Sequence, residues 1–105
     1  MKPHPLTLAH IRAVALKPGM YIRDFDLREL EMQLYGFDAG LAAAGVIGES
    51  DWFNRAFSDF LWTNAKVSCA QGWARAILEQ HGNGEESFKW FFLSLEEAMS
   101  KNSES

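Results

Sequence analysis

The sequence predicts an all-α fold: a compact, single-domain bundle of about five helices. Apolar residues recur at spacings of three and four along most of the chain, which is the period of an amphipathic helix. Polar capping residues stand before several of these segments. No segment alternates apolar and polar residues over the length of a strand. With 105 residues and 48% hydrophobic content, the chain 1–105 is expected to fold as one domain around one core.

The N-terminal part predicts an arm, a helix and a turn. Residues 1–6 contain two prolines and are expected to be irregular. Thr7 is the predicted N-cap of a short helix that runs to about Leu16. Pro18 disfavours further helix and, with the glycine after it, predicts a turn. Residues 20–22 are expected to form a short extended or 3₁₀ piece.

The longest predicted helix runs from Leu27 to Gly45 and organises the rest of the fold. Asp26 stands at its N-cap position, and Glu29 is placed to complete an acidic version of the capping box. Five apolar residues form one stripe that other helices should cover: Leu27, Leu30, Leu34, Phe37 and Leu41.

Two glycines inside this helix, Gly36 and Gly40, call for an explanation. Each costs about 1 kcal/mol relative to alanine in a helix interior. They lie four residues apart, with Ala44 next on the same line. We therefore expect another helix to approach closely along this line, and a kink at Gly36 is the alternative.

Three further helices follow, each announced by a polar residue. Ser50 or Asp51 is the predicted cap of the third, and capping boxes at 68–71 (Ser, Gln) and 83–86 (Asn, Glu) precede the fourth and fifth. Residues 100–105 are expected to fray. The predicted apolar faces are Phe53, Ala56, Phe57, Phe60 and Leu61, then Trp73, Ala76, Ile77 and Gln80, then Phe88, Phe91, Phe92, Leu95 and Met99.

Charge is unevenly distributed along the chain. Residues 1–23 carry +4 and contain no acid, whereas residues 24–59 carry −6. An acidic surface repels nucleic acid and attracts basic proteins. The alternative for each acid is a helix cap or a solvated helix face.

The sequence holds no arrangement typical of a catalytic or metal site. Cys69 and His81 are twelve residues apart on one predicted helix, about 18 Å along its axis, so they cannot meet. Cys69 is expected to be a small core residue. The three histidines lack ligand spacing, and there is no second cysteine for a zinc site. We therefore expect no enzymatic activity, no cofactor and no metal.

Other partner classes are also disfavoured. No apolar run is long enough to cross a membrane, and His10 and Arg12 interrupt any secretory signal, so a cytoplasmic protein is expected. A helix that reads DNA should expose basic or amide side chains, but the helix from Leu27 exposes mainly acids. What remains is a module that binds another protein.

Two tryptophans favour such a module. Trp62 and Trp90 lie off the apolar stripes of their predicted helices, among charged residues. A large aromatic ring in polar surroundings is typical of an interface hot spot. The alternative is that each ring packs under a loop or a neighbouring helix.

Four short stretches together resemble one family of bacterial proteins. They are KPGMYI at 17–22, LYGF at 34–37 with residues 39–41, GWARAI at 72–77 and FFLSLEE at 91–97. In this order they resemble small immunity proteins of contact-dependent inhibition and polymorphic toxin systems. Lys17, Phe37 and Met99 stand where that family more often has Arg, Tyr and an aromatic residue.

The resemblance implies an all-α antitoxin that binds and neutralises one cognate toxin domain, often a nuclease with a basic cleft. An acidic surface would be steered to such a cleft. The alternative is a non-enzymatic adaptor or a transcriptional regulator, including a DNA-binding one. The residues expected to bind the toxin are Asp24, Asp26, Glu29, Glu31, Glu49, Asp51 and Asp59, with Trp62 and Trp90 as weaker candidates.

Overall fold

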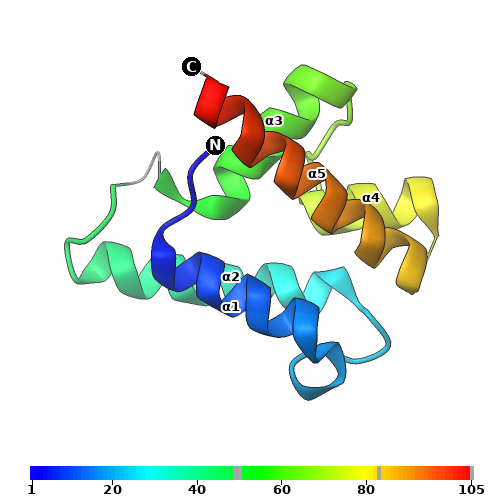
Figure 1. Cartoon of the computed structure of the whole chain (residues 1–105), viewed down its shortest axis with the longest axis horizontal. Helices are drawn as coiled ribbons and strands as arrows, with labels where there is room; N and C mark the ends of the chain where they lie inside the picture. Colours follow the sequence, from blue (N-terminus) through cyan, green and yellow to red (C-terminus); the bar gives the residue numbers. More distant parts are fainter. Residues whose placement is uncertain (49–50, 83, 105) are drawn as a thin grey trace.

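The computed structural model describes residues 1–48, 51–82 and 84–104, with side chains as far as residue 100. Within these residues the chain forms five α-helices, one 3₁₀ helix and no strand, which confirms the predicted all-α class. In Figure 1, α1 and α2 lie side by side across the lower half, and α5 passes above them with α3 and α4 behind. The helices are α1 Pro5–Leu16, η1 Pro18–Met20, α2 Leu27–Ala43, α3 Phe53–Ala65, α4 Trp73–His81 and α5 Glu85–Glu104.

Helix α1 begins three residues earlier than predicted, inside the expected arm. Pro5 occupies its first turn, where the missing N–H costs nothing, and His4 is the N-cap. His4 Nδ1 accepts a hydrogen bond from the Leu6 backbone N–H at 3.1 Å. The prediction that Thr7 caps this helix is wrong, because Thr7 is buried and its hydroxyl bonds to Asp38 of α2 instead.

Helix α2 packs against α1, α3 and α4. Asp26 is its N-cap as predicted, and Asp26 Oδ1 accepts from the Arg28 N–H at 2.9 Å. The predicted capping box does not form, since Glu29 accepts instead from the Arg23 N–H at 3.1 Å. The buried stripe is Leu27, Leu30, Leu34 and Asp38.

The predicted stripe of α2 departs from the observed one in its second half. Phe37 is 40% exposed, and its ring stacks on His10 at 4.8 Å between centroids. The predicted close approach of a helix to Gly36 and Gly40 is wrong. Both are exposed, and an added methyl group would meet nothing within 4 Å. These glycines therefore serve no helix packing within the described chain.

Helices α3 and α4 begin without the caps that the sequence predicts. Their N-cap residues are Trp52 and Gly72, and neither contributes a side-chain hydrogen bond to its helix. Ser68 and Gln71 are exposed in the preceding loop, so that capping box is wrong. Asp51 accepts from the Gly48 N–H and does not cap α3. Ser50 and Asn83, also expected as caps, lie outside the described residues.

Carboxylates of α2 replace the missing caps. Asp38 Oδ2 accepts the first N–H of α3, from Phe53, at 2.6 Å, and Asp38 Oδ1 accepts the Thr7 hydroxyl at 3.1 Å. One turn from the N-terminus of α2, Glu31 Oε2 accepts the Ala74 N–H of α4 at 3.1 Å. Two side chains of α2, seven residues apart, thus hold the starts of two other helices.

An aromatic cluster joins α3, α4 and α5 in the core. The Trp73 ring stacks on Phe91 at 4.7 Å and meets Phe57 edge-on at 5.4 Å. Trp73 is fully buried, and its Nε1–H donates to Asn54 Oδ1 at 2.8 Å. The predicted apolar faces are confirmed at these positions, whereas Gln80 is exposed. Helix α5 is described to Glu104, through most of the segment in which we expected fraying.

Candidate partner-binding surface

Three of the predicted acids lie at the N-terminal end of α2, and two of them serve the helix itself. Asp26 binds Arg28 through both carboxylate oxygens at 3.0 Å, and this hydrogen bonding lowers the pKa of Asp26. Glu29 accepts from the Arg23 N–H. Asp24 is exposed, with a backbone φ of 48°. Of these three acids, only Asp24 is exposed, whereas Asp26 and Glu29 are half-buried.

Glu31 has a structural role in the α2–α4 contact. Its carboxylate lies beside Gly72, where an added methyl group would stand 2.9 Å from both oxygens. Burial raises the pKa of Glu31, although hydrogen bonds from the Ala74 and Trp73 N–H groups act in the opposite direction. This side chain is therefore engaged with α4 and contributes little to an outer acidic surface.

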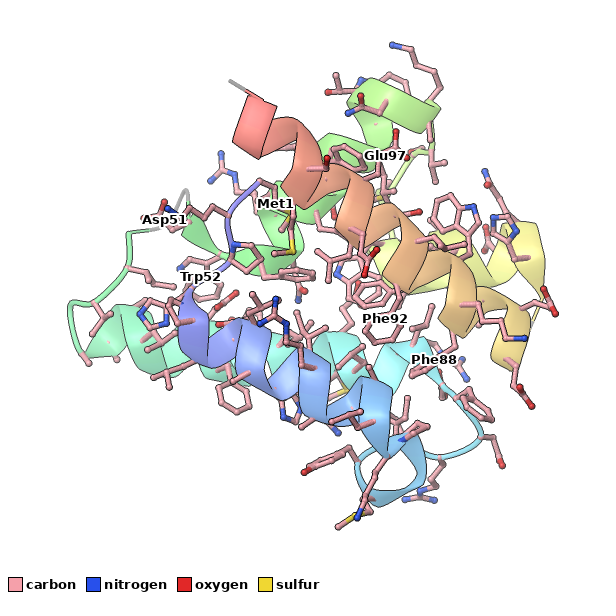
Figure 2. All side chains as sticks on the ribbon, viewed as in Figure 1. Met1, Asp51, Trp52, Phe88, Phe92 and Glu97 are labelled. Carbon is pink, nitrogen blue, oxygen red and sulfur yellow. The ribbon has the colours of Figure 1, made fainter. Side chains whose placement is uncertain are left out.

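The remaining predicted acids belong to the α3 region. Asp51 and Asp59 are exposed; Asp51 precedes α3, and Arg55 and Asp59 lie on successive turns of this helix. Glu49 lies outside the described residues. Figure 2 shows Asp51 and Trp52 at the left of the molecule and Phe88 at the right.

The predicted acids do not form one surface. Phe25, between Asp24 and Asp26, contacts Phe88 at 5.2 Å between ring centroids, so these acids lie at the Phe88 end. Asp51 lies at the other end, near Asp38, which is about 18 Å along α2 from Asp26. The structure therefore divides the acids into an α2 group and an α3 group.

The two tryptophans differ in their surroundings. Trp62 is 57% exposed on α3, and the Lys66 ammonium lies 5.9 Å from its ring centroid. Trp90 is half-buried, stacks on His81 at 4.7 Å and packs against the core. Trp90 therefore packs against a neighbouring helix, which was the alternative to an interface role. Trp62 has the exposure that an interface anchor needs.

The face where α2 meets α3, with its continuation along α3, gathers large exposed or half-buried side chains, and we name it the seam surface: Met32, Tyr35, Trp52, Arg55 and Trp62. Met32 is 75% and Tyr35 57% exposed, and the Tyr35 and Trp52 rings meet edge-on at 5.2 Å. Trp62 lies two turns beyond Arg55 on the same side of α3.

Two hollows mark the seam surface. They measure about 300 and 330 Å³ and share Tyr35 and Asn54 in their walls. Among the described residues, Trp52 Nε1 is buried without a hydrogen-bond partner. Aromatic rings, methionine and arginine around shallow hollows are the composition typical of a protein interface.

Sequence reasoning missed Met32 and Tyr35, although a signal was present. Both lie off the buried stripe of α2, so a helical projection places two large apolar side chains toward solvent. Trp52 was missed because it precedes α3 and belongs to no stripe.

The described residues hold no group of three or more potential metal ligands. Burial raises the pKa of the Cys69 thiol, which disfavours the reactive thiolate form. In the part of the chain that the structure describes, no helix combines the length and the apolar character needed to cross a membrane. Comparisons with protein-family models, with curated proteins and with solved structures find no match to this chain.

Proposed function

We propose that this chain is an immunity protein that acts in the cytoplasm by binding and neutralising one cognate toxin domain. The observation that carries the proposal is the seam surface, where exposed Met32 and Tyr35 line two adjoining hollows and exposed Trp62 lies two turns farther along α3 than Arg55. Such a patch on a small domain is typical of a docking site for another protein. The resemblance of four stretches to immunity proteins supplies the class of partner.

In this proposal the acids of α3 have the electrostatic role. Asp51 and Asp59 border the seam surface and are exposed, so they can face a basic cleft such as that of a nuclease. Asp24, at the far end of α2, adds to the long-range field without touching the docked toxin. Asp26, Glu29 and Glu31 accept hydrogen bonds from backbone N–H groups of the chain itself, so they contribute mainly to the fold.

Binding to the toxin encoded immediately beside this chain tests the proposal. We expect the two proteins to co-purify and cells that express both to survive. Tyr35→Ala and Trp62→Ala should each weaken toxin binding by about 2 kcal/mol, as truncation of an aromatic hot spot does. Leu93→Ala is the control, because Leu93 is 68% exposed on α5 and is not part of the seam surface. Absence of a complex would overturn the immunity role.

The acidic contribution has a separate test. Asp51→Lys and Asp59→Lys should lower the association rate and reduce its dependence on salt, because both acids border the docking face. Asp24→Lys, with the same change in charge at the far end, should act several-fold more weakly. If all three variants leave the rate and its salt dependence unchanged, the acidic-surface hypothesis is wrong while the immunity role stands.

A further inference from the structure

A second hollow region lies between α1 and α5, away from the residues of the seam surface. Two adjoining hollows of about 380 and 630 Å³ share Leu8, Arg12 and Met99 in their walls, so they form one groove. Phe92 lines it from α5, and Leu16 lines its far end on α1. We name this region the α1–α5 groove.

The walls of the groove are mostly apolar. Phe92 is half-buried, and Figure 2 shows it on the side of α5 that faces α1. Leu16 is 84% exposed at the rim, the highest exposure of any large apolar side chain in the described part of the chain. Removal of such a leucine from water is favourable, so an occupant with apolar side chains would be stabilised here.

The charge of the groove is opposite to that of the chain as a whole. Arg12 lies in both hollows, and Lys2 stands at one end, while residues 1–23 contain no acid. Lys17 follows Leu16 directly. Glu96 is the acid among the lining residues. A ligand that carries carboxylates beside an apolar stripe is therefore complementary to this groove.

We propose that the α1–α5 groove binds an amphipathic helix of another protein, with an apolar stripe flanked by Asp or Glu. The 12 residues of α1 extend for about 18 Å, or three turns, which accommodates apolar anchors at positions i, i+4 and i+7. This site is separate from the toxin-binding surface and does not depend on it.

Two other occupants fit less well. A bilayer presents a broad plane and not a ridge that enters a groove, and a chain of net charge −4 is repelled by anionic lipid. A second copy related by a two-fold axis would set the cationic rims, with Arg12 and Lys17, against each other. Charge complementarity therefore selects an acidic helix.

A library of helical peptides is the probe for this proposal. Its members share an apolar stripe and vary the flanking positions among Asp, Glu, Ser, Lys and Arg. After selection on the intact chain, we expect Asp and Glu to be enriched at the flanks. Enrichment of Lys or Arg, or of no sequence, overturns the proposal.

Matched variants locate the binding. Arg12→Ser with Leu16→Ser removes one cation and one leucine of the groove, both exposed and four residues apart. Lys89→Ser with Leu93→Ser removes the same types at the same spacing from α5, outside the groove. The first pair should weaken the selected peptides about tenfold and the second less than about twofold. Equal effects overturn the assignment.

The competing occupants have their own measurements. In flotation with vesicles that contain anionic phosphatidylserine, the chain should remain unbound. In analytical sedimentation, the chain should show no self-association through the groove, that is, none that the Arg12→Ser/Leu16→Ser pair abolishes. Vesicle binding or dimerisation lost in that pair would overturn the acidic-helix proposal in favour of a membrane or a second copy.

Discussion

At the scale of single residues, Gly36 and Gly40 weaken α2 without any packing benefit in the described chain. A methyl group at either position would meet no atom within 4 Å. We expect Gly36→Ala and Gly40→Ala each to raise the free energy of unfolding by about 1 kcal/mol, measured by urea denaturation. A fall in stability in either variant would contradict the open surroundings seen here.

Gly72 is the matched counterexample, because its φ is +94° and a methyl group there would lie 2.9 Å from the Glu31 carboxylate oxygens. Gly72→Ala should lower the free energy of unfolding by about 1–3 kcal/mol, through backbone strain and displacement of that carboxylate. The same urea titration measures it. An unchanged free energy would show that the α2–α4 contact tolerates this displacement.

The buried carboxyl of Glu31 makes stability depend on pH. Since its pKa is raised in the folded protein, the folded state retains this proton to higher pH than the unfolded chain does. The stabilisation is fully present below the unfolded pKa and is lost as pH rises through the folded pKa. Glu31→Gln keeps an acceptor oxygen without the charge. Its free energy of unfolding relative to the original chain should therefore increase as the pH rises above the ordinary pKa of a glutamate. A difference independent of pH would contradict this.

At the scale of elements, the sequence predicted the helices better than their caps. Asp26 caps α2 locally, and local motifs could identify it. Helices α3 and α4 are started by Asp38 and Glu31, which lie 15 and 43 residues before the amides that they accept. Capping motifs relate residues three or four apart, so they cannot reveal contacts over these separations. Thr7 was misassigned for the same reason, since its partner is on another helix.

Asp38 joins three helices, so its replacement should be costly. Asp38→Ala leaves the Phe53 N–H and the Thr7 hydroxyl without their acceptor in a buried site, and we expect a loss of about 3 kcal/mol. Asp38→Asn retains one acceptor oxygen and should lose less. Thr7→Val removes a single bond and should lose about 1 kcal/mol. Chemical denaturation of the three variants should give this order, and equal losses would contradict the bridging role.

At the scale of the whole molecule, helical periodicity could predict the aromatic core but not the grouping of surface residues. Trp73 and Phe91 occupy predicted apolar positions, and they meet in the core. The acids fall within residues 24–59, yet Asp26 lies at the Phe88 end of the molecule and Asp51 near Asp38, about 18 Å along α2. Residues that are close in sequence need not lie close together on the surface, because consecutive helices run in different directions. For the same reason, the sequence could not predict that residues of α2 and α3 form the seam surface together.

The aromatic cluster should make unfolding cooperative. Phe91→Ala opens a cavity beside Phe53, Phe57 and Trp73, and it should lower the free energy of unfolding by about 3–5 kcal/mol within one transition. Leu93→Ala, two residues away and exposed, should change it by less than about 0.5 kcal/mol. Near-ultraviolet and far-ultraviolet circular dichroism should give the same midpoint. Separate midpoints would show that α5 unfolds independently.

Because α2 supplies carboxylates for the starts of α3 and α4, Trp52 and Gly72 make no side-chain hydrogen bond to the helices that they precede. The residue that precedes α3 therefore need not be a Ser, Thr, Asp or Asn that caps the helix. It leads directly into Trp52 and Arg55 of the seam surface. Under the proposed function, substitutions in this stretch could change toxin specificity during evolution without altering the arrangement of the helices.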